Sequence, residues 1–68
     1  MMKEIATILI NDADSGSDGA VIVRAGGGLI GLCVSIMENG DAEAFFGQSD
    51  CRKILKALET ALASIEPE

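Results

Sequence analysis

Residues 29–46 decide the fold, and they read LIGLCVSIMENGDAEAFF. Two apolar runs flank the dipeptide Asn39-Gly40, which readily supplies the two positive-φ residues of a type I′ turn. The pattern predicts a β-hairpin whose two-residue loop is Asn39 and Gly40. In that register Val34 faces Phe45 across the hairpin.

The predicted hairpin has two chemically different faces, because side chains alternate along a strand. The first face is aliphatic with one aromatic residue, and comprises Ile30, Leu32, Val34, Ile36 and Phe45. The second face has small residues at its middle, and comprises Leu29, Gly31, Cys33, Ser35, Met37, Ala42, Ala44 and Phe46. This difference predicts that the two faces pack against different neighbours.

Two more strands are expected before the hairpin. Residues 3–10 are rich in β-branched side chains, and residues 20–25 form a second short apolar run. The first of these runs is apolar on both faces, so its register stays open. Strands of that kind are buried on both sides or lie at an interface.

The glycine triplet at residues 26–28 joins the second expected strand to the hairpin. With Gly26 and Gly27 as the turn, Val23 faces Ile30, so the two valines of this strand join the first face. Ile22 and Arg24 then join the second face. A phosphate-binding loop is disfavoured, because such loops join a strand to a helix and a Walker loop ends in Gly-Lys-Ser/Thr.

A helix is predicted over residues 49–65, with Ser49 as its N-cap and Asp50 near the positive end of its dipole. Its apolar residues recur every three or four positions and are Cys51, Ile54, Leu55, Leu58, Leu62 and Ile65. The predicted fold is therefore α+β, a single domain over 1–68. It is a four-stranded antiparallel meander sheet (β-β-β-β-α) with one C-terminal helix packed on the first face.

Length and charge narrow the function classes. A 68-residue chain buries only about 60% of the surface of its unfolded form, so domains of this size often add disulfides, a metal or a partner subunit. Eleven acidic and five basic residues give a net charge of −6, which disfavours nucleic acid and anionic membranes as partners. With no signal segment or membrane span in the sequence, a cytoplasmic protein is expected.

No cofactor or metal is expected. The two cysteines, Cys33 and Cys51, form no CxxC motif, the chain has no histidine, and both thiols are expected to be reduced. The acidic loop at residues 11–19 is a poor calcium loop. Counted from Asp14, Gly16 replaces the third ligand and Ala25 replaces the twelfth. A solvated loop is the favoured interpretation.

The second face is predicted to be a dimer interface. One helix covers one face of a sheet, and a large uncovered apolar patch marks an interaction site. A two-fold dimer is the commonest way to close such a surface. An ordinary solvated face is the alternative. The predicted interface residues are Ile22, Leu29, Gly31, Cys33, Ser35, Met37, Ala44 and Phe46.

A second candidate site binds a partner or an anion. Its basic part includes a cluster on the expected outer side of the helix, in the first half, where the dipole disfavours cations. Its acidic part lies in the loop after the first strand. The residues are Arg24, Arg52, Lys53, Lys56, Asp12, Asp14 and Asp18. A solvated helix face, with Glu59 pairing with Lys56, is the alternative for the basic cluster.

The favoured function is a non-catalytic homo-oligomeric interaction module that docks a protein partner, since no serine or cysteine has an evident base. The acidic carriers would be Asp12, Asp14, Asp18, Glu38, Asp41 and Glu43. They would act as an inhibitor or regulator that competes with nucleic acid. The alternative is a protein that binds a nucleotide or other small anion at a dimer interface.

Two resemblances bear on this choice. In size and charge the chain resembles the acidic inhibitors that phages and mobile elements use against host defences. Its β-β-β-β-α order resembles that of transcriptional coactivators that bind single-stranded DNA, which use basic residues and aromatic platforms. The acidic charge and the two phenylalanines of this chain make direct nucleic-acid binding a disfavoured expectation.

Overall fold

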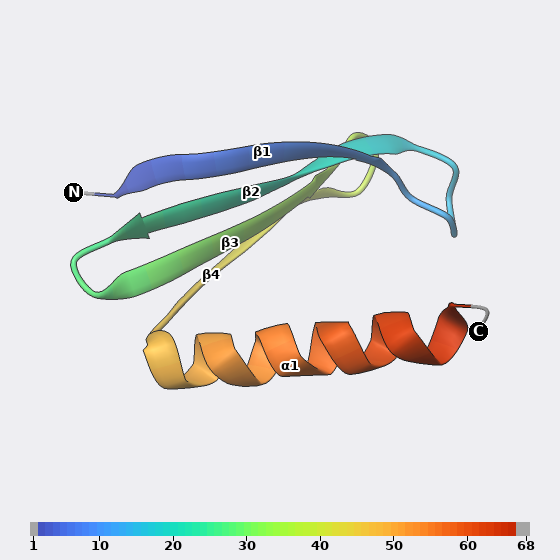
Figure 1. Ribbon diagram of the computed structural model, residues 1–68. Coiled ribbons are helices and arrows are strands. Elements are labelled where there is room, and N and C mark those ends of the chain that lie inside the picture. Colours follow the sequence, from blue (N-terminus) through green and yellow to red (C-terminus); the bar gives the residue numbers. More distant parts are fainter. Residues whose placement is uncertain (1, 67–68) are drawn as a thin grey trace.

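A computed structural model describes residues 2–66, which form four strands and a helix (Figure 1). The elements are β1 (Lys3–Asn11), β2 (Asp18–Gly26), β3 (Leu29–Ile36), β4 (Gly40–Phe46) and α1 (Gln48–Ile65). The strands form one sheet in the order β1-β2-β3-β4 with every neighbouring pair antiparallel, and α1 crosses one side of it. The predicted α+β meander with a C-terminal helix is confirmed.

The turn between β2 and β3 is a two-residue glycine turn, one position later than predicted. Gly27 and Gly28 have φ angles of 60° and 78°, as a type I′ turn requires. Val23 consequently pairs with Leu32 instead of Ile30. The shift in pairing is two residues, an even number, so the predicted faces of β2 and β3 are unchanged.

The turn between β3 and β4 differs from the prediction in a way that matters. Its loop has three residues, 37–39, and Gly40 at the start of β4 has a φ of 83°. The Asn39 N–H donates to the carbonyl of Ile36 at 3.0 Å. Three-residue loops of this kind need one positive-φ residue, which Gly40 supplies. Asn39 is therefore not in the left-handed region, since no described non-glycine residue has a positive φ.

This longer loop reverses the faces of β4. Val34 pairs with Ala42 and Gly31 pairs with Phe45, a shift of three residues from the predicted register. Because an odd shift exchanges the two faces of a strand, placing Phe45 on the first face was wrong. Placing Ala42, Ala44 and Phe46 on the second face was also wrong.

The register of β1, which the sequence left open, is given by its pairing with β2. Ile8 pairs with Val21 and Thr7 pairs with Ile22, and the ladder slips between Glu4 and Ala6. We call the side of the sheet facing α1 the helix side. It carries Ala6, Ile8, Ile10, Val21, Val23, Ile30, Leu32, Val34, Ala42, Ala44 and Phe46. We call the other side the open side.

The helix begins one residue earlier than predicted. Its N-cap is Gly47, which makes no side-chain capping bond, so the predicted capping role of Ser49 is wrong. The Cys51 N–H donates to the Gly47 carbonyl at 3.0 Å, and Asp50 lies in the first turn as expected. α1, the helix of the described residues, is not apolar enough along its length to cross a membrane.

Candidate functional site: the cleft between helix and sheet

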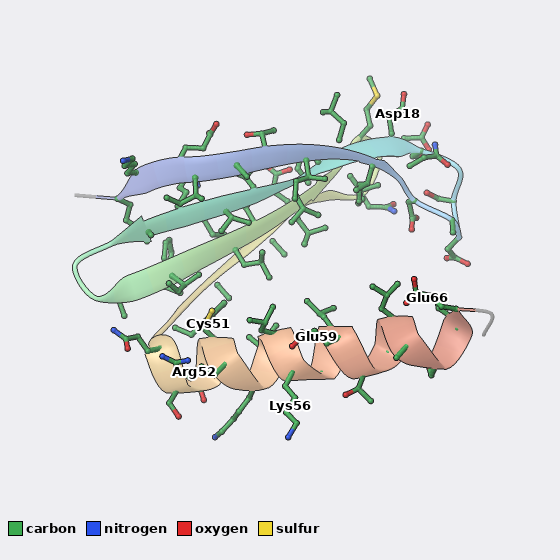
Figure 2. The ribbon with its side chains drawn as sticks, viewed as in Figure 1. Asp18, Cys51, Arg52, Lys56, Glu59 and Glu66 are labelled. Atoms are coloured by element: carbon green, nitrogen blue, oxygen red, sulfur yellow. The ribbon has the colours of Figure 1, made fainter. Side chains whose placement is uncertain are left out.

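The helix side of the sheet faces the apolar residues of α1, but among the described residues the two layers do not bury each other's side chains. We call these helix residues the apolar stripe: Cys51, Ile54, Leu55, Leu58, Leu62 and Ile65. Within residues 2–66 no residue of α1 is buried. Leu58 is 62% exposed and Ile65 is 79% exposed, although both belong to the stripe that a sheet normally covers. Opposite them, Ile8 is 52% exposed. The two apolar surfaces therefore line an unsealed cleft, in which the helix meets the sheet mainly over β3 (Figure 2).

The cleft is closest to closed near the start of α1. A cavity of about 200 Å³ lies there between the two layers. Its lining is entirely apolar and comprises Val23, Ile30, Leu32, Phe46, Cys51, Ile54, Leu55 and Leu58. Phe46 lines this cavity because the three-residue loop turns it to the helix side. The sequence analysis missed this role because it assumed a two-residue loop.

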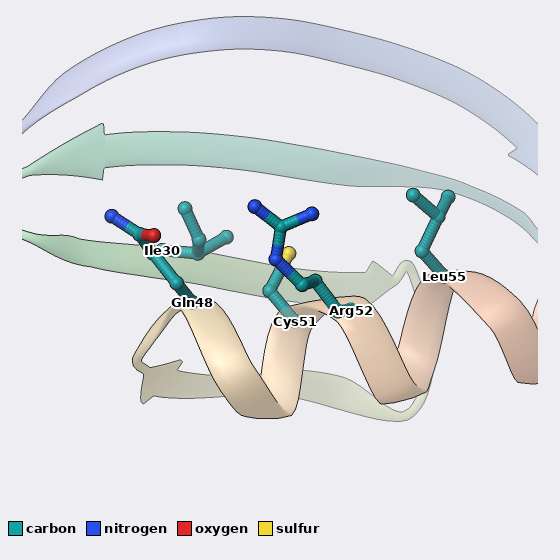
Figure 3. A pocket seen from close by; sticks show the side chains of 5 residues that line it. All are labelled: Ile30, Gln48, Cys51, Arg52 and Leu55. Carbon is teal, nitrogen blue, oxygen red and sulfur yellow. The ribbon is translucent and has the colours of Figure 1, made fainter.

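A second cavity of about 220 Å³ opens at the rim of the cleft, lined by Ile30, Gln48, Cys51, Arg52 and Leu55. Figure 3 shows the Gln48 amide beside Ile30 and the Arg52 guanidinium beside Cys51, both directed toward the sheet. The predicted basic cluster is therefore divided. Arg52 borders the cleft, whereas Lys56 points away from the sheet in Figure 2. Gln48 was not predicted, since a polar residue in the first turn of a helix gives no distinctive signal.

The remaining helix charges make weak local contacts. Lys53 Nζ lies 3.7 Å from Asp50 Oδ1, with both side chains well exposed. Exposed pairs of this kind contribute at most about 1 kcal/mol. The ion pairs among residues 2–66 are Arg24–Glu43 and Lys53–Asp50. The Lys56–Glu59 pair of the alternative interpretation is not among them.

The middle of the open side, around Gly31 and Cys33, is covered by side chains of the sheet itself, whereas Leu9 at its edge is 83% exposed. Arg24 on β2 reaches across β3 to form an ion pair with Glu43 on β4. Cys33 on β3 pairs with Glu43 and is 8% exposed, which makes it the one buried hydrophobic residue among those described. The Phe45 ring covers Gly31, where an added Cβ would lie 3.0 Å from its edge. Covering a strand glycine with a cross-strand aromatic ring stabilises the sheet.

The predicted dimer-interface residues are consequently divided between two sides. Five lie on the open side, namely Ile22, Leu29, Gly31, Cys33 and Ser35. Met37 lies in the β3–β4 turn and is 82% exposed. Ala44 and Phe46 lie on the helix side. A dimer through the open side stays a prediction, but its surface is more polar than expected, because Ser35 Oγ also donates to Asp41 Oδ1 at 2.6 Å.

The charges of the chain are separated along the sheet. The loop containing Asp12 and Asp14 lies at the same end as the β3–β4 turn, since the Met37 N–H donates to the Asp18 carbonyl at 3.1 Å. Lys3 lies beside Ala25, toward the opposite end of the sheet. Arg52 also lies toward that opposite end, near Ile30 at the start of β3. One end of the molecule is thus acidic and the other holds most of the cations.

The acidic loop is an ordered turn. Asp12 Oδ2 accepts hydrogen bonds from the Ser15 hydroxyl at 2.7 Å and from the Ser15 N–H at 3.1 Å. The Asn11 amide donates to the Gly16 carbonyl at 2.8 Å. The Ser15 hydroxyl, and secondarily its N–H, hold the pKa of Asp12 below its ordinary value, because both bonds favour the charged carboxylate.

Replacing Ser15 with alanine should raise the pKa of Asp12, while the remaining N–H bond keeps it below the ordinary value. A depressed pKa stabilises the fold above the unfolded pKa, and that stabilisation is lost as pH falls through the folded pKa. The variant should lose less stability on acidification. Carboxyl chemical shifts followed by NMR against pH measure this. Ser17→Ala is the control, and an equal shift in both variants would contradict the assignment.

The two thiols lie on different layers, Cys33 on the open side of the sheet and Cys51 on α1 facing the helix side, and both are free. Within residues 2–66 no group of three or more histidine, cysteine, aspartate or glutamate side chains is arranged to hold a metal ion.

Fold and site together define a small α+β protein, an antiparallel meander whose single helix leaves an apolar cleft unsealed. Comparison of the chain with protein-family models, with curated proteins and with solved structures gives no match.

Proposed function

We propose that this protein is a non-catalytic interaction module that works as a homo-oligomer and docks a protein partner. The observation that carries the proposal is the uncovered stripe of α1, whose residues Leu55, Leu58 and Leu62 are all more than half exposed. Large apolar patches on a soluble domain mark interaction sites. A single chain of this size gains too little burial to leave such a stripe in water without a partner.

The size of the uncovered surface supports an oligomer over a monomer. A 7.0 kDa chain has about 4,000 Å² of accessible surface when it is compact, whereas this chain has 5361 Å². The radius of gyration is 13.5 Å, against about 11 Å for a compact domain of this length. The protein is thus more open than an independent domain.

The acidic end supports a protein partner with a basic surface. Asp14 and Glu38 are exposed and lie at the same end of the sheet, so they are free to pair with cations of a partner. Electrostatic complementarity of this kind mainly accelerates association and sets specificity. A module whose carboxylates pair with such a surface would compete with nucleic acid for it.

The test has two parts. Sedimentation velocity, from nanomolar to high micromolar protein, should show a species larger than the monomer. Immobilised protein should then capture a partner whose binding weakens on Asp14→Lys with Glu38→Lys. The control Lys53→Glu should leave the capture unchanged. A monomer at every concentration contradicts the homo-oligomer, and capture that ignores the acidic end contradicts the docking surface.

A second candidate function is the binding of a small anion, such as a nucleotide. The cavity at the rim of the cleft favours it, because Arg52 supplies a cation and Ile30 and Leu55 supply apolar contact. A ligand that binds the native state raises the melting temperature by mass action. A nucleotide that raises the melting temperature of the natural protein but not of Arg52→Ala would favour this function.

A further inference from the structure

We propose that a second copy of this chain closes the cleft, with the two α1 helices antiparallel and their apolar stripes meeting around Leu58. The inference rests on the proposed function, because it names the partner and the geometry of the homo-oligomer. It places the interface on the helix side of the sheet, opposite to the side that the sequence pattern predicted.

The area to be covered matches a stable dimer. The chain exposes about 1,300 Å² more than a compact chain of its mass. Covering that excess on both copies buries about 2,600 Å² in total, which lies in the range of obligate homodimers, about 2,000–5,000 Å². Obligate interfaces are also the more hydrophobic ones, and the closed end of this cleft is lined by apolar side chains.

The stripe itself fixes the register. Leu58 is the centre of the apolar positions, since Cys51 and Ile65 each lie seven residues from it and Ile54 and Leu62 each lie four residues from it. In an antiparallel pair centred on Leu58, every stripe residue therefore meets an apolar residue of the partner. A two-fold axis through Leu58 produces this arrangement, as an isologous dimer requires.

The charges favour the antiparallel direction. The first half of α1 carries three cations and one carboxylate, a net charge of +2, namely Arg52, Lys53, Lys56 and Asp50, whereas Glu59 lies in its second half and Glu66 follows its end. In an antiparallel pair each basic half lies beside the acidic half of the partner, and the helix dipoles also oppose each other. A parallel pair would place like charges side by side.

The sheet offers the partner helix a further apolar surface. Ile8 and Val34 are both on the helix side and are 52% and 39% exposed. The first half of the partner's helix would cover them, because in an antiparallel pair centred on Leu58 it lies beside the second half of this chain's α1, which runs toward that end of the sheet. The open side also exposes apolar side chains, with Leu9 83% and Phe45 54% exposed, but no apolar helix stripe faces it, and the Arg24–Glu43 ion pair divides its apolar surface.

Cross-linking with a short bismaleimide tests the geometry, because packed helix axes lie about 8–10 Å apart. In a chain with Cys33→Ala and Cys51→Ala, Leu58→Cys should give a covalent dimer for most of the protein. In a chain with Cys33→Ala alone, Ile65→Cys should cross-link to the partner's Cys51. Adding Cys51→Ala to that second variant should abolish the product. The two Ile65 positions of an antiparallel pair lie about 21 Å apart along the helices.

Ile22→Cys, without the two native thiols, reports on the open side and should not cross-link. Circular dichroism and sedimentation on each variant show that it is folded and assembled, and the Ile65→Cys pair keeps the test decisive should Leu58→Cys not fold. A sedimenting dimer that cross-links through Ile22→Cys, or through Ile65→Cys without Cys51, overturns the inference and leaves the proposed function intact. A monomer that cross-links nowhere overturns both.

Discussion

Replacing Gly19 with alanine will lower the free energy of unfolding by about 1–3 kcal/mol. The new Cβ would lie 2.4 Å from the carbonyl oxygen of Ser35 and 2.8 Å from Cδ1 of Ile36. The oxygen belongs to the backbone of β3, one residue before Ile36, which pairs with Gly19. The clash therefore forces the two strands apart, because a backbone atom cannot rotate out of the way as a side chain does.

Thermal unfolding at a fixed protein concentration measures this loss, since the melting temperature of an assembling protein depends on concentration. For a domain of this size each kcal/mol corresponds to roughly 4–8 °C. The matched comparison is Gly47→Ala, where φ is −84° and no heavy atom lies within 4 Å of the new Cβ, so that only the loss of a favourable N-cap residue, about 0.5–1 kcal/mol, is expected. Equal melting temperatures for the two variants would show that the close approach at Gly19 is not what requires glycine.

Replacing Gly27 and Gly28 together with alanine will be at least as damaging, but for a different reason. Nothing lies within 4 Å of a Cβ at either position, so there is no clash. Both residues have positive φ angles, 60° and 78°, which cost an L-residue with a Cβ about 1–2 kcal/mol each. The expected loss is therefore about 2–4 kcal/mol, measured by urea unfolding at fixed protein concentration.

The control for the turn is Gly27→Asn. Asparagine tolerates the left-handed region, and Asn-Gly is a favoured type I′ pair. This variant should retain nearly the full stability of the natural protein. A Gly27→Asn variant as unstable as the double alanine variant would contradict the φ-based explanation. The two glycine experiments thus separate a requirement for space at Gly19 from a requirement for backbone conformation at the turn.

The sequence was sufficient for the order of the elements and for most of their faces. β-branched runs and turn residues predicted the four strands, and the three- and four-residue spacing from Cys51 to Ile65 predicted the helix. The faces of β2 and β3 were correct even though their turn was misplaced by one residue. A misplacement of that kind changes the pairing by two positions, which leaves each side chain on the same side.

The face of β4 could not be predicted, because Asn39-Gly40 fits two loops of different length. The two-residue loop needs both residues at positive φ, and the three-residue loop needs only Gly40. The choice between the two loops decides which of Phe45 and Phe46 lies on the helix side of the sheet. The close packing of the Phe45 ring over Gly31 is a long-range contact that favours the longer loop, and local sequence does not show it.

The unsealed cleft could not be predicted from the sequence either. Amphipathic spacing indicates which side of α1 is apolar, but not how closely the helix approaches the sheet. That distance depends on the short connection at Gly47 and on the bulk of side chains such as Phe46 at its narrow end. The predicted oligomer is retained as a proposal, while the surface proposed for it has moved to the helix side.

Because α1 is exposed in a single chain, its stability is expected to depend on the concentration of the protein. An eighteen-residue helix with no buried residue in a single chain is held mainly by its own hydrogen bonds, and such helices open readily in water. If the helices pair as proposed, dilute chains would offer a fraying α1 to proteases, whereas concentrated chains would shield one another. Degradation would then remove the protein when it is scarce and spare it once production exceeds a threshold, so that its level in a cell would respond steeply to its rate of synthesis.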